Sequence, residues 1–213
     1  SNYNTRSTHT KSTIVKNYDE WGLLLGKNID LVTNLLSNPF TLSDIVNVEN
    51  PFTTGEAYDL LDIIEDNIDF NAESNFKLIN TGTIKKYDSL WGIKKTTYLK
   101  NHYENPIIDR KLFKKYFPKR FNQAITPKII IKGIRYFDSF LDLEGNYIAG
   151  KSTLVLLNPK DPITLNCILG IINSKLIFFY LKEAFGALGI DGGINFSKEM
   201  VKGIPIPEFR NEI

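Results

Sequence analysis

Residues 126–157, TPKIIIKGIRYFDSFLDLEGNYIAGKSTLVLL, decide the fold class. Isoleucine dominates residues 128–134, which is typical of a central strand covered on both faces. Residues 153–157 form a second short apolar run, so a further buried strand is predicted there. Between these runs, residues 137–143, the turn Glu144-Gly145-Asn146 and the residues from Tyr147 onward predict a hairpin. The stretch therefore predicts a β-sheet core.

Shorter elements are expected on both sides of this core. Upstream, apolar spacing predicts strands at residues 45–48, 76–79 and 93–99 and helices at residues 28–36 and 108–117. Pro118 is expected to end the second helix, Thr81-Gly82 to form a turn, and residues 57–64 fit either a strand or a helix. Downstream, Asp161-Pro162 predicts the start of two apolar helices, residues 163–172 and 175–185, before an extended end at residues 204–207.

The predicted fold class is mixed α/β (α+β), a twisted mixed β-sheet core with helices at the N- and C-terminal ends. Residues 1–16 are rich in Ser, Thr and Asn and are expected to be a flexible tail or linker. Residues 17–213 are expected to form one domain.

Charge is segregated along the chain although the formal net charge of the 213 residues is only +2. Residues 41–76 hold nine acids and no base, whereas residues 77–136 hold fifteen bases against three acids, a net charge of +12. Such segregation points to a surface that faces a polyanion.

No residue pattern in the sequence indicates a catalytic centre. Cys167 lies in an apolar run and is expected to be a buried, inert thiol, and neither His9 nor His102 has metal ligands at suitable spacing. The glycines of residues 186–193 follow a helix, which favours a helix exit over a phosphate loop. No apolar stretch approaches the ~20 residues of a membrane span, so a cytoplasmic chain without membrane contact is expected.

Binding of nucleic acid is the remaining interpretation. Three basic and aromatic clusters occur within sixty residues, and we expect them to form one continuous face along a duplex. Their candidate DNA contacts are Lys85, Lys86, Tyr87, Trp91, Lys94, Lys95, Lys114, Lys115, Lys132, Arg135 and Tyr136.

Four blocks in order resemble a known family. They are SDIVNVENPFTTGEAYDL (43–60), FKLINTGTIKKYDSLWGIKKTTYL (76–99), the stretch 126–157 quoted above, and ILGIINSKLIFFYLKEAF (168–185) followed by IPIPE (204–208). Together they resemble the C-terminal target-recognition domain of TaqI and Eco57I-like adenine-N6 DNA methyltransferases, some of which are single-chain restriction-modification enzymes. By position the first block adds Thr54 and Gly55 to the candidate DNA contacts.

The resemblance implies a DNA target-recognition domain at residues 17–213 that reads a short duplex sequence from the major groove. It also implies that an N-terminal methyltransferase domain of the same polypeptide holds S-adenosylmethionine and methylates a flipped adenine. The parent is expected to use Mg²⁺ as well if it carries a fused nuclease. No cofactor, metal or catalytic residue is expected within this chain.

Two alternatives to DNA recognition stay open. The acidic residues 41–76 would suit a protein-interaction module that docks a basic partner. A small metal-dependent nuclease would use Asp109 and Lys111, which have the acid-x-Lys spacing of such enzymes.

Overall fold

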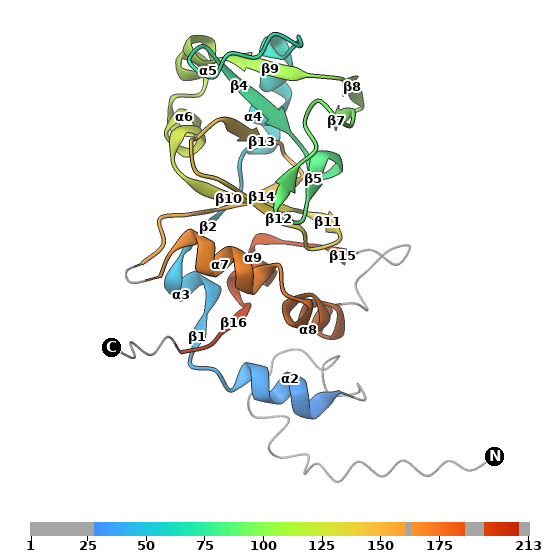
Figure 1. The fold of residues 1–213 in the computed structure, drawn as a ribbon, viewed down its shortest axis with the longest axis vertical. Helices are drawn as coiled ribbons and strands as arrows, with labels where there is room; N and C mark the ends of the chain where they lie inside the picture. The colour runs from blue at the N-terminus through green and yellow to red at the C-terminus, as the bar shows by residue number, and fades with distance from the viewer. Residues whose placement is uncertain (1–27, 161–162, 186–193, 209–213) are drawn as a thin grey trace, which may run out of the picture.

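A four-stranded sheet lies at the centre of the computed structural model, which describes residues 28–160, 163–185 and 194–208. Strand β10 (Lys128–Lys132) runs antiparallel between β12 (Ser139–Asp142) and β14 (Thr153–Leu157), and β2 (Asn47–Glu49) pairs with the outer side of β14 (Figure 1). The side chains of Ile129, Ile130 and Ile131 are fully buried. The predictions of a central strand and of a buried strand at residues 153–157 are confirmed.

A second sheet has the order β13-β4-β9-β3, formed by β13 (Tyr147–Ala149), β4 (Asn75–Ile79), β9 (Pro106–Asp109) and β3 (Glu65–Asp66). Strand β13 is parallel to β4, whereas the other pairs are antiparallel, so the sheet is mixed. The predicted hairpin after residue 137 is wrong, because β12 stays in the first sheet while β13 crosses to the second. The crossing turn is fixed by distant contacts: a Cβ on Gly145 would lie 2.3 Å from the Ile125 carbonyl oxygen.

Four two-stranded pairs complete the strands. They are β1 (Phe40–Thr41) with β16 (Pro205–Ile206), β5 (Ile84–Lys85) with β6 (Asp88–Ser89), β7 (Thr96–Tyr98) with β8 (Asn101–Tyr103), and β11 (Ile134–Arg135) with β15 (Ile194–Asn195). Only β7 remains of the strand predicted at residues 93–99. The pairing of β1 with β16 joins the two ends of the described chain.

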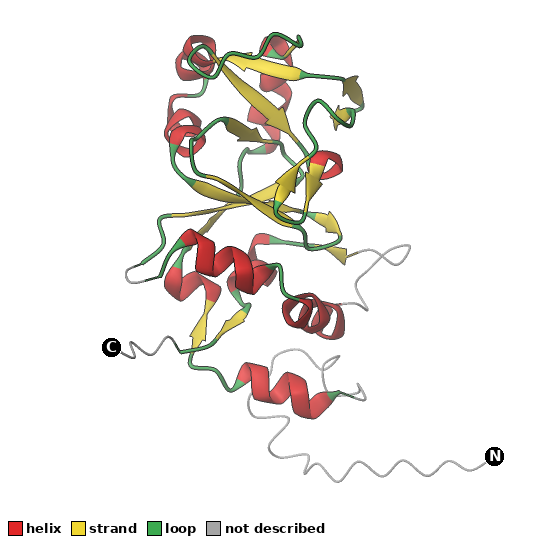
Figure 2. Cartoon of the chain, in the orientation of Figure 1, coloured by secondary structure: helices red, strands yellow, loops and turns green. Residues whose placement is uncertain are grey.

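The helices surround the sheets from below and above (Figure 2). In chain order they are α2 (Ile29–Leu36), α3 (Leu42–Ile45), α4 (Thr54–Asp59), the 3-10 turns η2 (Leu60–Ile63) and η3 (Thr81–Thr83), α5 (Arg110–Tyr116), α6 (Pro118–Ile125), α7 (Leu165–Ile172), α8 (Lys175–Phe185) and α9 (Lys198–Lys202). The predicted turn at Thr81-Gly82 is the 3-10 turn η3.

Several predicted boundaries need correction. The helix expected at residues 108–117 begins only at Arg110, because residues 106–109 join the second sheet. Asp109 caps α5 by accepting a hydrogen bond from the Leu112 amide at 2.8 Å. Pro118 follows α5 but begins α6, where its missing N–H costs nothing. Residues 42–45 are helical and the strand there begins only at Asn47. The described part of α7 begins at Leu165 with Thr164 as cap, and Asp161-Pro162 lie outside the described residues, as do residues 1–16, His9 and the glycines of 186–193.

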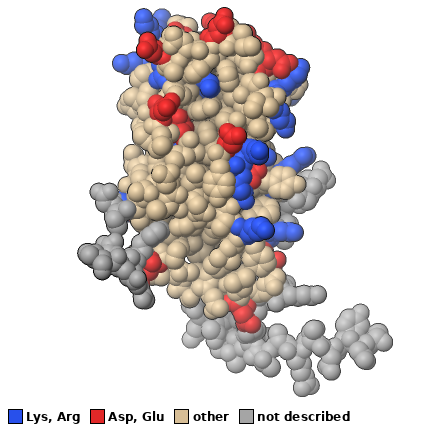
Figure 3. All heavy atoms as spheres, in the orientation of Figure 1, with Lys and Arg blue, Asp and Glu red and all other residues tan. Residues whose placement is uncertain are grey.

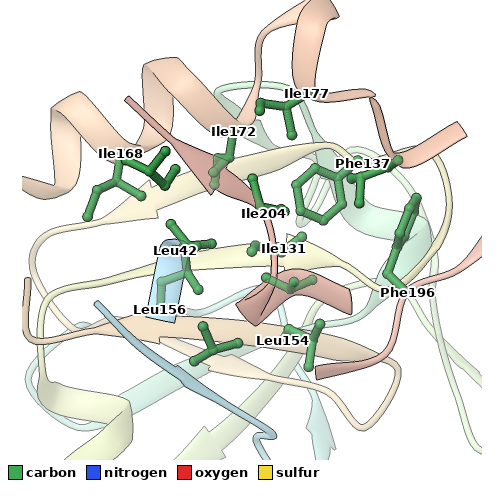
Figure 4. Packing of buried hydrophobic residues seen from close by; sticks show 14 of the residues in the cluster. Leu42, Ile131, Phe137, Leu154, Leu156, Ile168, Ile172, Ile177, Phe196 and Ile204 are labelled. Atoms are coloured by element: carbon green, nitrogen blue, oxygen red, sulfur yellow. The ribbon is translucent and has the colours of Figure 1, made fainter. Parts of the chain in front are cut away.

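The largest core lies below the central sheet, where α3, α7, α8 and α9 cover β10 and β14 (Figure 4). Ile168 and Ile172 of α7 point toward Ile131 and Leu156 of the sheet. The same helical period turns Cys167 outward, so the prediction of a buried thiol is wrong. A second core, around Phe76 and Phe113, fills the upper part of the molecule.

Helices α7 and α8 meet at an angle of 58°. Within the described ranges no single helix has the length and apolar composition to cross a membrane, and these two satisfy that criterion only as a bent pair.

Candidate nucleic-acid interface

The turn between β5 and β6 presents Lys86 and Tyr87 beside the central sheet. The Tyr87 amide donates a hydrogen bond to the Ser139 carbonyl at 2.8 Å, and the Lys86 Nζ donates to the Asn173 carbonyl at 2.7 Å. The Tyr87 side chain is 57% exposed and its φ is +67°. The backbone of the turn is therefore anchored while its aromatic ring remains accessible.

Asn173, at the junction of α7 and α8, holds this region together. Its buried side chain accepts hydrogen bonds from the Ser139 amide and hydroxyl at 3.1 and 3.0 Å and donates to the Ser139 carbonyl at 2.9 Å. These bonds join the start of β12 to the two helices, and Lys86 adds the β5–β6 turn to the same junction. Asn173 thus has a structural role, because it joins β12, the β5–β6 turn and the two helices.

The segment that leaves β10 lies next to this junction. Lys132 Nζ is 3.9 Å from the Asp138 carboxylate and 5.5 Å from the centre of the Tyr136 ring. The Tyr136 ring is 6.3 Å from the Phe178 ring of α8 and is 59% exposed. Arg135 lies in β11, next to Tyr136 in the sequence, and is exposed.

We call this surface the hairpin face, and it consists of Lys85, Lys86, Tyr87, Lys132, Arg135 and Tyr136. In Figure 3, Lys and Arg side chains gather along the side of the molecule where Figure 1 places β11, β12 and α8. Cations and accessible aromatic rings therefore occur together on one surface.

Sequence reasoning missed two cations that extend the hairpin face. Lys175 and Lys182 are exposed on α8, one on either side of Phe178 along the helix. Their spacing of seven residues places them on one side of α8, together with the Phe178 ring that contacts Tyr136. Both lysines are visible in the sequence of the apolar helix, but they lie outside the basic stretch 77–136 that supplied the basic candidate contacts.

Other predicted contacts lie elsewhere, so the expectation of one continuous basic face is wrong. Lys114 and Lys115 are exposed on α5, which lies at the upper end of the molecule on the side opposite β11 (Figure 1). Lys94 and Lys95 precede β7, and Lys95 Nζ is 2.6 Å from the Glu104 carboxylate. This contact raises the pKa of Lys95.

The Trp91 side chain packs against other residues in the upper part of the molecule. Its indole N–H donates to the Pro106 carbonyl at 2.8 Å, and its ring meets the Phe70 ring edge-on at 5.8 Å. Lys77 Nζ lies 4.8 Å from the Trp91 ring, 4.3 Å from the Phe70 ring and 5.5 Å from the Tyr147 ring. Burial among these rings lowers the pKa of Lys77. The indole of Trp91 is thus engaged inside the protein.

Thr54 and Gly55 begin α4, and Thr54 lines a polar cleft of about 700 Å³. The Thr54 hydroxyl accepts a hydrogen bond from Lys151 Nζ at 2.8 Å, and no atom lies within 4 Å of a Cβ built on Gly55. The cleft is lined by Glu49, Asn50, Phe52, Thr53, Thr54, Arg120, Lys151 and Lys198. None of these residues belongs to the hairpin face.

Beside this cleft, the Arg120 guanidinium binds the Glu56 carboxylate through contacts of 2.7, 3.2 and 3.2 Å. Hydrogen bonds from Arg120, followed by those from Thr53, outweigh the opposing effect of burial and lower the pKa of Glu56 to about 2. The contact therefore stabilises the fold only while Glu56 is ionised.

We expect the free energy of unfolding to fall by about 1–2 kcal/mol as the pH drops from about 4.5 to about 2 through this contact alone. The folded pKa of Glu56 lies below its unfolded value, so the stabilisation is complete above about pH 4.5 and is lost as the carboxylate takes up a proton. Urea denaturation at a series of pH values measures it. Glu56→Gln should flatten this part of the profile, whereas Glu73→Gln, in an exposed loop, should leave it unchanged; equal profiles for wild type and Glu56→Gln would contradict the assignment.

The hairpin face lies within a part of the chain that matches a known protein family. The model of the TaqI-like C-terminal specificity domain matches residues 77–206, which include all six residues of the hairpin face and both added lysines of α8. No curated protein matches the chain. The match covers more than half of the chain and agrees with the resemblance found in its sequence blocks. This chain belongs to the family of TaqI-like C-terminal specificity domains.

Proposed function

We propose that this chain reads a short duplex DNA sequence for an adenine-N6 DNA methyltransferase of a restriction-modification system, and that the hairpin face is the surface it places on the DNA. A TaqI-like specificity domain implies DNA sequence recognition in methyltransferase-type proteins. The observation that carries the finer proposal is the convergence on one surface of cations and exposed aromatic rings from three segments of the chain, two of them fastened together by Asn173.

The chemistry of the hairpin face suits a duplex. Lys85 and Lys175 are exposed and would neutralise phosphates along the DNA backbone. The Tyr87 and Tyr136 rings are more than half exposed, so they would lie against sugars or base edges. Lys86 is bound to Asn173, so it contributes positive charge and a fixed turn more than a movable side chain.

Membership in a specificity-domain family suggests that the chemical step takes place outside this chain. In our proposal, an N-terminal methyltransferase domain of the same cytoplasmic polypeptide holds S-adenosylmethionine and methylates a flipped adenine. A fused nuclease domain of the parent, if it has one, would use Mg²⁺. This chain would orient the duplex relative to those domains.

The acidic stretch 41–76 is less suited to docking a protein than its composition indicated. Several of its carboxylates have partners within the fold: Asp44 binds Thr41, Glu49 binds Gln123, Glu56 binds Arg120, and Asp66 accepts from the amides of Glu104 and Asn105. These contacts use the acids to hold loops and helix ends. Asp109, the acid of the nuclease alternative, likewise caps α5.

The salt dependence of duplex binding tests the proposal. If the hairpin face neutralises about four phosphates, the affinity should fall about 100-fold between ~50 and ~200 mM salt. Fluorescence anisotropy of a labelled duplex titrated with the chain measures this slope. Lys85→Ala should reduce the slope by about one, because one counterion fewer would be released. Absence of binding at ~50 mM salt, or binding with no salt dependence, would contradict the proposal.

A further inference from the structure

The backbone at Arg135 has an unusual conformation for a residue with a long side chain. Its φ is +71°, and the Tyr136 amide donates a hydrogen bond to the Ile134 carbonyl at 3.0 Å, two residues back. These two features define a γ-turn of the positive-φ form, which is rare and strained. Glycine is the residue that adopts such a φ at little cost, yet arginine occupies the position.

The surroundings of Arg135 force this conformation. Ile134 and Arg135 pair with Asn195 and Ile194 of β15, and the Gly133 carbonyl accepts from the Phe196 amide at 2.8 Å. On the other side of the turn, the Phe137 and Phe196 rings meet at 4.9 Å. The segment that carries Arg135 is thus fixed before and after the turn.

The strain is not offset by contacts of the side chain. Arg135 is exposed, and within the described ranges its guanidinium has no hydrogen-bond or ion-pair partner. A strained residue held by its surroundings, with a side chain directed to solvent, is typical of a functional position. A lysine here would carry the same positive charge, whereas only arginine presents a planar fork of donors.

We infer that Arg135 is a sequence-discriminating contact of this chain, and that its guanidinium reads the O6 and N7 edge of a guanine in the major groove. The inference rests on the proposed function. The planar guanidinium matches these two acceptors through two parallel hydrogen bonds, which is the most common base-specific contact of arginine. The rigid turn holds the fork in place before binding, so less conformational freedom is lost on contact.

Selection of bound duplexes from a random-sequence library tests the inference, with wild type and three variants. Wild type should enrich a motif with a G·C pair at a fixed position. Arg135→Lys keeps the charge but loses the fork, and Arg135→Gly loses both while relieving the positive φ. Both variants should still bind the library, and their preference for G·C at that one position should fall about 5- to 150-fold. Arg135→Gly should melt at a temperature no lower than wild type, because glycine adopts the turn without strain.

Lys100→Gly is the matched control. Lys100 is also exposed, has a φ of +74° and lies in the tight turn between β7 and β8. This substitution removes one positive charge and one positive-φ side chain but should leave the motif unchanged. A change of motif like that of Arg135→Gly would overturn the inference, because charge or strain alone would then explain the effect.

Replacing the selected guanine by 7-deazaguanine isolates the proposed contact. Loss of N7 should weaken wild-type binding and leave binding by Arg135→Gly unaffected. If wild type enriches a motif that both Arg135 variants retain, or if 7-deazaguanine weakens both proteins equally, the inference fails and the proposed function stands. If wild type binds duplex DNA without enriching a motif, the inference also fails. If wild type binds no duplex, the proposed function itself fails.

Discussion

Lys128→Met is expected to lower the free energy of unfolding by about 3–5 kcal/mol, because it removes one partner of a buried ion pair. Lys128 Nζ lies 2.5 Å from the Asp142 carboxylate, and the two side chains are 1% and 2% exposed. Nζ also donates to the Ala124 carbonyl at 2.5 Å. Burial lowers the pKa of Lys128, and the charge of Asp142 opposes that effect. Methionine fills a similar volume but leaves the carboxylate without its cation.

The Lys128→Met/Asp142→Asn double variant separates the charge effect from loss of packing. Asp142 also accepts from the amides of Asn146 and Tyr147 at 3.0 and 3.1 Å, and the asparagine oxygen can retain one of these bonds. The double variant contains no buried unpaired charge, so it should be more stable than Lys128→Met alone. Guanidinium denaturation of wild type, Lys128→Met, Asp142→Asn and the double variant at neutral pH gives the coupling energy of the pair. Losses that simply add would show that the pair is not coupled and would contradict this account.

Local sequence patterns predicted part of the fold and missed the parts that depend on distant contacts. Strands β10 and β14 and helices α7 and α8 were predicted well, because each is a continuous apolar run whose period shows within a few residues. The path from β12 to β13 was not, because it depends on contacts distant in sequence. Arg110, for example, binds the Gly145 carbonyl and the Asn146 side chain at 3.2 and 2.8 Å.

The same limitation applies to the charges. Several of the fifteen bases in residues 77–136 have internal roles, among them Lys77 among aromatic rings, Lys86 with Asn173, Arg110 at the turn before β13, Arg120 with Glu56, and Lys128 with Asp142. A charge count cannot distinguish these from surface lysines, so it overstated the basic surface. Burial and long-range partners decide whether a basic side chain lies on the surface, and neither is visible in a charge pattern.

The residues of the hairpin face were predicted from the sequence, but the contacts that bring them together were not. The clusters around Lys85 and Arg135 were both found from their mixture of bases and aromatics. What brings them together is Asn173, which is 34 residues from Ser139 and 87 residues from Lys86 in the sequence. The lysines of α5 were grouped with them because sequence proximity was taken as proximity in space, whereas α5 and β11 lie on opposite sides of the molecule.

Lys85→Glu combined with Arg135→Glu is expected to weaken duplex binding about 100-fold or more at ~50 mM salt. Each substitution replaces an attraction to phosphate or base by a repulsion, at the centre of the proposed contact surface. Both side chains are exposed, so the fold should tolerate the change, and circular dichroism and thermal melting check this. Lys114→Glu combined with Lys115→Glu changes the net charge of the chain by the same amount, on the distant helix α5.

The comparison of these two double variants in one anisotropy titration tests most directly whether the hairpin face carries DNA binding. The account predicts that reversing Lys85 and Arg135 abolishes or greatly weakens binding, while reversing Lys114 and Lys115 weakens it only a few-fold through the change in net charge. Equal losses in the two variants, or a larger loss for the α5 variant, would contradict it.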